Sequence, residues 1–251
     1  MRKKDEKLYC FSPGVMLATL LIEFSGALYT LIRYRLTVRT AILAASLLAL
    51  GVFQLAEYFI CTGVVLSGLS WARLGFVAIS LLPPLGIELA MNLAGKSLSW
   101  LRYLIWGVCA AFVIYYGFAS SALTSEVCLG NYVIFTGLHP YGGYLYGAYY
   151  FSLLALGVGL SRHWARQVSD ASLARALRGL SLGYLVFIVP TTIVALLKPE
   201  TQAAIPSIMC GFAVFLALML LLVVAPCSHL PSRLSLSRQQ SAQNIKQDQD
   251  N

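Results

Sequence analysis

Apolar residues fall into seven long runs along this chain, separated by shorter polar segments. Each run is close to the roughly 20 residues that an α-helix needs to cross about 30 Å of hydrocarbon. The pattern predicts an all-α membrane protein, a bundle of seven transmembrane helices that forms one domain over residues 1–226. The expected helices cover residues 12–32, 41–64, 72–95, 101–120, 142–161, 179–198 and 204–226.

Composition supports a membrane location. Hydrophobic residues make up 59% of the chain and charged residues 11%, whereas a soluble domain usually has about a quarter of its residues charged. We therefore expect a multi-pass protein of the plasma or inner membrane, with the lipid bilayer as its main partner and no nucleic acid. Residues 227–251 differ from the rest, because they are rich in Ser, Gln, Asn and Asp and lack aromatic residues. They are expected to form a disordered polar tail.

The positions of Lys and Arg predict the orientation. If the N-terminus lies outside, the inner segments hold 12 of these residues and the outer segments six, four of them in the N-terminal tail. Because Lys and Arg concentrate in cytoplasmic loops, we expect an exterior N-terminus and a cytoplasmic C-terminus. The first apolar run is too long for a cleaved signal and lacks a small-residue cleavage site, so it is expected to remain as an anchor.

Two of the predicted loops are longer than the others. The outer loop, residues 121–141, has no Lys or Arg and contains a β-like run at 132–136, so we expect it to be ordered and to cap the bundle. The inner segment, residues 162–178, combines four arginines with Trp164 and with Asp170 as a helix N-cap. This composition predicts a short surface helix on anionic headgroups, serving as a positive-inside anchor rather than as a binding site for a partner.

Three glutamates lie inside apolar runs: Glu23, Glu57 and Glu88. A charge at the centre of a membrane helix costs roughly 2.5 to 3.5 kcal/mol on insertion scales, so these side chains should face protein or water. Gln54 lies one helical turn before Glu57, and Arg73 begins the next helix on the same side of the membrane. The three glutamates and Gln54 are the candidates for ligand binding or proton relay.

Two interpretations of these residues remain open. In the functional one, Glu57, Gln54 and Glu23 line a polar pocket that opens outward and binds a ligand or passes a proton. In the structural one, Glu57 pairs with Arg73, and the other carboxyls are protonated and hydrogen-bonded between helices. The functional interpretation is favoured for Glu57 and the structural one for Glu88.

Prolines and tyrosines mark further features of the runs. Helix kinks are expected at Pro83, Pro84, Pro190 and Pro206, because each proline frees a carbonyl that neighbouring groups must satisfy. Five tyrosines at the start of the fifth run and just before it predict a girdle at the headgroup level, and a stacking wall for an aromatic ligand is the alternative. They are Tyr141, Tyr144, Tyr146, Tyr149 and Tyr150.

The six cysteines do not form a metal-binding pattern. Neither a CxxC pair nor a Cys/His cluster with zinc-like spacing occurs, so no metal and no cofactor are expected. With the predicted topology, Cys61 and Cys128 fall on the exterior face, where a disulfide between them would tie down the outer loop. Free, packed thiols are an equal alternative, because bridging depends on a Cα separation that the sequence does not contain.

Two stretches resemble a known family. Residues 71–95, WARLGFVAISLLPPLGIELAMNLAG, resemble the third-helix signature of the seven-transmembrane sensor region at the N-terminus of many bacterial histidine kinases and cyclases. Residues 173–190, LARALRGLSLGYLVFIVP, resemble that family's approach to its sixth helix. The resemblance extends over about residues 12–226 and implies helices that pass an exterior or membrane signal to a cytoplasmic catalytic domain. Because the segment after Pro226 is too short and too polar for such a domain, it implies a stand-alone sensor that acts through a partner.

Other seven-helix families fit less well. A retinal-binding rhodopsin needs a lysine inside its last helix, and residues 204–226 contain none. A eukaryotic-type G-protein-coupled receptor is disfavoured because the third run ends without an acidic-arginine pair and the seventh lacks an Asn-Pro-x-x-Tyr ending.

Three classes of function are therefore compared. A signal-sensing, receptor-like module that binds a small ligand or senses the membrane, and acts through a cytoplasmic or membrane partner, is favoured. The alternative is a small proton-coupled transporter that uses the intramembrane carboxylates, although the two halves of the chain show no convincing repeat. An enzyme is not expected, because Ser, His and Cys are not grouped to supply a nucleophile or a metal site.

Overall fold

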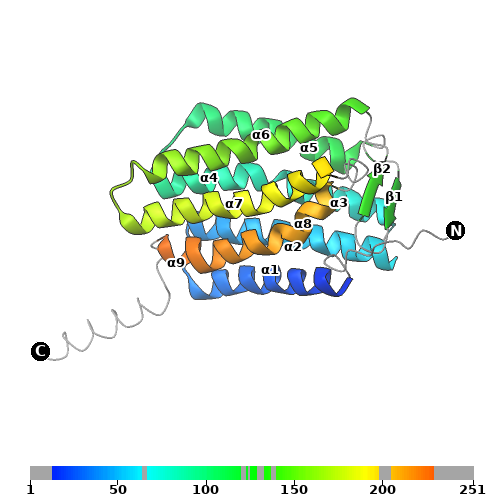
Figure 1. Ribbon diagram of the computed structural model, residues 1–251, viewed down its shortest axis with the longest axis horizontal. Coiled ribbons are helices and arrows are strands. Elements are labelled where there is room, and N and C mark those ends of the chain that lie inside the picture. The colour runs from blue at the N-terminus through cyan, green and yellow to red at the C-terminus, as the bar shows by residue number, and fades with distance from the viewer. Residues whose placement is uncertain are drawn as a thin grey trace, which may run out of the picture.

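The computed structural model describes residues 13–63, 67–119, 123, 125–128, 133–136, 140–197 and 205–228. Its helices lie side by side along one direction and form an elongated bundle (Figure 1). In the described part of the chain, seven helical spans are long and apolar enough to cross a membrane. The helices are α1 Pro13–Arg33, α2 Val38–Thr62, α3 Gly68–Ser80, α4 Leu82–Ala94, α5 Ser99–Phe118, α6 Pro140–Ala165, α7 Ala171–Leu197, α8 Ile205–Met219, the π-helical segment η3 Leu220–Val224, and α9 Ala225–Cys227.

The prediction of seven apolar spans is confirmed, with shifts at several boundaries. α2 begins at Val38 because the Thr37 side chain accepts a hydrogen bond from the Thr40 N–H. It ends at Thr62, directly before Gly63, whose φ of 67° is a left-handed conformation that favours glycine. α3 and α4 together make the third span, and α8, η3 and α9 make the seventh.

The inner segment differs from its prediction. α7 begins at Ala171, eight residues before the expected start at 179, because Asp170 Oδ1 accepts from the backbone N–H groups of Ser172 at 2.7 Å and Leu173 at 3.1 Å. Asp170 is therefore an N-cap, but of the membrane-spanning helix rather than of a separate surface helix. Trp164 is buried in the last turn of α6, so its ring packs in the protein core instead of lying on headgroups.

The helices pack around α2 and the third span. α2 contacts α1, α3, α4 and α8, and α4 also contacts α6 and α7. Of the seven spans, the one made by α3 and α4 is the most buried and α5 is the least. η3 approaches its neighbours closely at two glycines: a Cβ on Gly26 would lie 2.6 Å from Leu221, and one on Gly179 would lie 2.6 Å from Val223. Small residues at such contacts let membrane helices pack tightly.

A β-hairpin covers one end of the bundle. Its strands, β1 Ser125–Cys128 and β2 Val133–Thr136, are antiparallel and pair Ser125 with Thr136 and Cys128 with Val133. Both strands contact α2, and β1 also contacts α3. β2 confirms the β-like run predicted at 132–136, whereas its partner strand was not predicted. We call this end of the bundle, with β1 and β2, the hairpin end.

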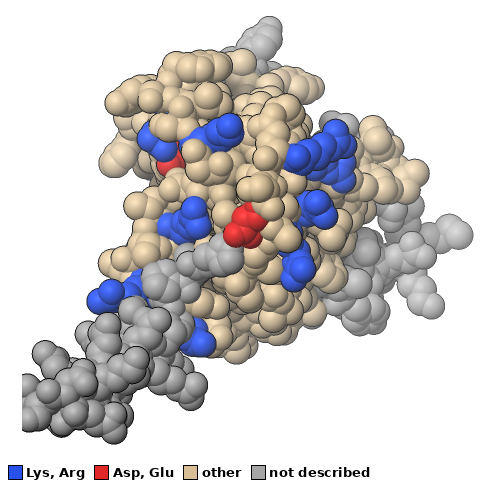
Figure 2. All heavy atoms as spheres, turned by 90° about the vertical axis from the view of Figure 1, so that its left-hand side faces the viewer, with Lys and Arg blue, Asp and Glu red and all other residues tan. Residues whose placement is uncertain are grey.

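The opposite end carries most of the positive charge. Figure 2 shows Lys and Arg side chains spread over this face, with few acidic ones between them. At the hairpin end, within the described residues, Arg73 is the one Lys or Arg. We call the opposite face the basic end. It includes Arg33, Arg35, Arg39, Lys96, Arg102, Arg162, Arg166, Arg175 and Arg178.

Candidate functional site

Two glutamates from neighbouring helices are buried inside the bundle. Glu23 lies near the middle of α1 and is 0% exposed, and Glu57 lies in the second half of α2 and is 1% exposed. The two carboxyls are close enough to repel each other when both are ionised. Both side chains thus face protein rather than lipid, as expected for carboxyls inside a membrane-spanning bundle.

α8 supplies the other side of this site. Gln54 Nε2 donates to the Cys210 carbonyl at 2.7 Å, and Ser207 is hydrogen-bonded to Glu57. Gln54 and Glu57 are three residues apart on α2, and Ser207 and Cys210 are three residues apart on the antiparallel α8. One helical turn of each helix therefore supplies two matched polar contacts. Neither α8 residue was predicted from the sequence: Ser207 is one of many serines in the chain, and the acceptor at Cys210 is a main-chain carbonyl, which no sequence pattern marks.

The site has more hydrogen-bond acceptors than donors. Within the described residues, both carboxylate oxygens of Glu23, Oε1 of Glu57 and Oε1 of Gln54 are buried and have no hydrogen-bond partner. A buried polar group without a partner costs free energy, and a buried unpaired charge costs far more. A proton shared by the two carboxyls would provide a donor and remove their repulsion. We call Glu23, Gln54 and Glu57 the acceptor cluster.

Arg73 does not neutralise the acceptor cluster. Among the described residues the ion pair within 4 Å joins Arg102 to Glu88, and Glu57 is hydrogen-bonded to Ser207 instead. Arg73 Nε is buried without a hydrogen-bond partner in the described part. The structure thus differs from the predicted Glu57–Arg73 pair, because Glu57 faces α8, whereas α3 packs against the Phe53 side of α2.

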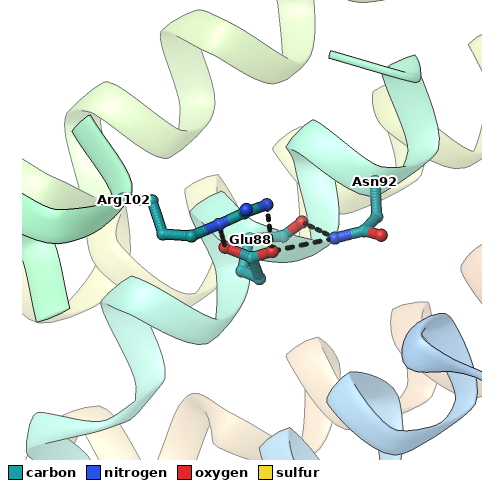
Figure 3. Close-up of polar contacts among 3 residues, drawn as sticks. All are labelled: Glu88, Asn92 and Arg102. Atoms are coloured by element: carbon teal, nitrogen blue, oxygen red, sulfur yellow. Dashed lines mark hydrogen bonds and ion pairs between the residues drawn. The ribbon is translucent and has the colours of Figure 1, made fainter. Parts of the chain in front are cut away.

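Glu88 has a different environment, shown in Figure 3. Arg102 Nε and Nη2 donate to Glu88 Oε2 and Oε1 at 2.9 and 2.8 Å, and Asn92 Nδ2 donates to Oε1 at 3.0 Å. This two-bond fork joins α4 to the first turn of α5, and its geometry is the strong one for an arginine–carboxylate pair. The structure therefore places Glu88 in a clamp between helices near the basic end, apart from the acceptor cluster.

A second arginine joins helix ends at the basic end. Arg39, in the first turn of α2, donates from Nη2 to the Asn92 carbonyl at 2.9 Å and from Nη1 to the Ser228 carbonyl at 3.0 Å. Both acceptors are carbonyls at helix C-termini, where a cation is favoured. Arg39 thus holds the end of the seventh span against α2 and α4, a role that the sequence analysis did not identify.

The prolines have three different consequences. The third span is divided at Leu81, two residues before Pro83 and Pro84. Pro84 has no N–H to give to the Ser80 carbonyl, and this carbonyl instead accepts from the Tyr149 hydroxyl at 2.6 Å and the Cys109 thiol at 3.3 Å. Pro190 lies within α7, which continues through it, and Pro206 lies in the first turn of α8, where a proline is tolerated.

The tyrosines of the fifth span do not form one girdle. Tyr144 is exposed, whereas Tyr146, Tyr149 and Tyr150 are buried. Tyr146 packs against Phe76, Phe112 and Tyr116 with ring centroids 5.0 to 5.5 Å apart. The buried rings therefore belong to the protein core, and the side chain of Tyr141 lies outside the described residues.

The cysteines fall into two groups. Cys61 is disulfide-bonded, and Cys109, Cys210 and Cys227 are free. The side chain of Cys128 lies outside the described residues, so its pairing with Cys61 stays a prediction. β1, which ends at Cys128, contacts α2, and Cys61 lies in the last turn of α2.

The fold and the site define an α-helical multi-pass membrane protein with a buried polar cluster. No protein-family model matches the chain, and no curated protein matches it. The resemblance to the sensor regions of histidine kinases and cyclases therefore stays an expectation from residues 71–95 and 173–190.

Proposed function

We propose that this protein is a signal-sensing membrane module in which the acceptor cluster takes up a proton and a partner receives the response. The observation that carries the proposal is the burial of Glu23 and Glu57, near enough to repel each other, in a site where three of their four oxygens have no partner among the described residues. One proton converts a repelling pair into a hydrogen-bonded pair. The free energy of proton binding therefore strengthens the packing of α1, which carries Glu23, against α2, which carries Glu57.

The seventh span connects this cluster with the basic end. α8 carries Ser207 and Cys210, which contact the α2 side of the cluster, and it continues through η3 and α9 to Ser228, whose carbonyl accepts from Arg39. η3 is a π-helical turn that ends two residues before Pro226, and such turns often occur where a helix is bent for function. In this proposal, protonation shifts α8, and the shift reaches the Arg39 contact.

The charge distribution supports the orientation of the proposed sensor. The basic end carries nearly all Lys and Arg of the described part, and Lys and Arg concentrate on the cytoplasmic side of membrane proteins. We therefore propose an exterior hairpin end, a cytoplasmic basic end and a location in the cell membrane. The partner would then meet the protein at the basic end.

A spin label at Cys227, a free and partly exposed cysteine of α9, tests the proposal in liposomes. A step from mildly alkaline to mildly acidic buffer should change the mobility of the label in the wild type and leave it unchanged in Glu57→Gln. Asp170→Asn is the matched control, because it removes an exposed carboxyl while Asn also caps helices. The Cys227→Ser variant supplies the background from other thiols. An unchanged label in the wild type, or an equal response in Glu57→Gln, would contradict the proposal.

The second candidate is a proton-coupled carrier, and the same two carboxyls favour it. A carrier must also expose its proton site in turn to each side of the membrane. Gln54 and Glu57 are at most 2% exposed, so this structure shows the cluster closed to both sides. Flux of protons across the same liposomes separates the two candidates: a sensor responds to pH without net flux, whereas a carrier produces flux that Glu57→Gln abolishes.

A further inference from the structure

Four arginines lie around the turn between α6 and α7. Arg162 is in the last turn of α6 and Arg166 follows its end, and Arg175 and Arg178 are within the first two turns of α7. All four side chains are exposed. In the part of the chain that the structure describes, none of them forms an ion pair, since the pair within 4 Å joins Arg102 to Glu88. We call these four arginines the basic tip.

The basic tip extends beyond the neighbouring helices. α6 has 26 residues and α7 has 27. At 1.5 Å per residue, helices of this length measure about 40 Å, compared with about 30 Å of hydrocarbon. In Figure 1 the turn between them protrudes past the adjacent ends of α1 and α2. A turn that protrudes in this way at one end of a membrane-spanning bundle lies where lipid headgroups are found in a bilayer.

The backbone of the turn is fixed. Asp170 caps α7, the N–H groups of Gln167 and Val168 donate to the Trp164 carbonyl at 2.9 and 3.0 Å, and the Trp164 ring is buried. Arg175 and Arg178 lie three residues apart in α7, so their side chains emerge on the same face of that helix, and Arg166 lies in the turn directly after α6, four residues after Arg162. The guanidinium groups are thus held on a rigid frame, which lowers the entropy cost of binding.

The arginines continue the lipid-facing surfaces of both helices. On α7, the exposed apolar residues Leu182, Val189 and Ile193 follow helical spacing, and Arg178 and Arg175 extend the same stripe toward the tip. On α6, the exposed positions 145, 148, 152, 155 and 159 lead in the same way to Arg162 and Arg166. The arginines therefore lie where the exposed stripes of the two helices reach the basic end.

We propose that the basic tip is a binding site for phosphate groups of anionic lipids. Arginine suits this ligand, because its planar fork donates two hydrogen bonds to one phosphate. The lateral direction of the two stripes favours a lipid over a soluble acidic protein, which would approach from the water side. The proposal does not depend on the acceptor cluster.

Native mass spectrometry of the full chain in detergent tests this site with equal amounts of phosphatidylglycerol and phosphatidylcholine. The wild type should retain phosphatidylglycerol preferentially. Each single replacement of an arginine of the basic tip with Gln should lower this preference about fivefold, as expected for one basic residue near an anionic surface. The variant with all four replacements, the four-arginine variant, should lose the preference. Gln preserves helix propensity, and an unchanged unfolding temperature shows that the variants are folded. The matched control is Arg35→Gln with Lys96→Gln, two exposed cations of the basic end outside the tip.

The outcomes separate the alternatives. Loss of the preference in the four-arginine variant, with little loss in the control, supports the site. An equal loss in the control contradicts it, because net charge then explains the binding. Displacement of the lipid by inorganic phosphate at the same concentration would indicate a site for free phosphate and overturn the proposal, as would tighter binding of an acidic peptide than of phosphatidylglycerol.

Discussion

Glu88 and the two glutamates of the acceptor cluster have opposite surroundings in this bundle. Glu88 accepts three side-chain hydrogen bonds, from Arg102 and Asn92. Glu23 accepts none and Glu57 has Ser207, within the described residues. The same residue type therefore stabilises one helix contact as a paired charge, whereas the carboxyls of the acceptor cluster have no cation within 4 Å among the described residues. The difference shows that the partner, not the depth in an apolar run, decides whether a buried carboxyl is structural.

The largest expected effect is on thermal stability, when the clamp between Glu88 on α4 and Arg102 on α5 is broken. Glu88→Gln replaces an acceptor of Arg102 with an amide that cannot accept the same two-bond fork, so the unfolding temperature should fall by roughly 5 °C. Glu57→Gln should change it much less, because no cation depends on that carboxyl. Thermal unfolding in a fixed detergent compares the two. Equal losses in both variants would show that the two environments do not differ as described.

The acceptor cluster should show coupling between its two carboxyls. If Glu23 and Glu57 share one proton, then the effects of Glu23→Gln and Glu57→Gln on the free energy of unfolding are not additive, with a coupling of about 1.5 kcal/mol. A double-mutant cycle in denaturant measures this energy. Glu88→Gln combined with Glu57→Gln is the control pair and should be additive. Strict additivity of the Glu23 and Glu57 effects would contradict a shared proton.

The Ser80 carbonyl is a buried backbone acceptor whose donors can be compared with those of the glutamates. The Ser80 carbonyl, freed by Pro84, is satisfied by the Tyr149 hydroxyl and the Cys109 thiol. Tyr149→Phe removes the shorter of these bonds and should cost about 1 kcal/mol of unfolding free energy. Tyr144→Phe is the control, because Tyr144 is exposed. A cost no greater than that of the control would mean that the freed carbonyl does not need this donor.

Arg73 should show the smallest effect. Since it forms no ion pair with Glu57, Arg73→Gln should leave the pH response of a label at Cys227 unchanged and alter the unfolding free energy by less than about 0.5 kcal/mol. The spin-label measurement in liposomes provides the first value and denaturant unfolding the second. A lost or shifted pH response of the label would show that Arg73 interacts with Glu57, as predicted from the sequence.

Much of the architecture was predictable from the sequence, for a physical reason. A lipid core requires about 20 apolar residues per helix, so the seven spans were visible as runs, and buried glutamates inside them had to face protein. The start of α7 was less visible, because Arg175 and Arg178 interrupt the apolar pattern although their side chains point outward. A helix cap at Asp170 gave the better boundary.

The partners of the glutamates were harder to predict. Arg73 was predicted as the partner of Glu57 because it begins the next helix on the same side of the membrane. The same rule, applied to Glu88, would have found Arg102. The rule fails at Glu57 because rotation about the helix axis points its side chain at α8, where Ser207 and Cys210 lie about 150 residues further along the chain. Helix rotation depends on packing across the whole bundle, which the pattern of one run does not contain.

Infrared difference spectroscopy of the reconstituted protein tests the central claim most directly, because a protonated carboxyl in a dry site has its own C=O stretching band. The account predicts this band at neutral pH in the wild type and in Glu88→Gln, and its loss or shift in both Glu23→Gln and Glu57→Gln. A wild-type spectrum without the band, or a band that only Glu88→Gln removes, would contradict a proton held between Glu23 and Glu57.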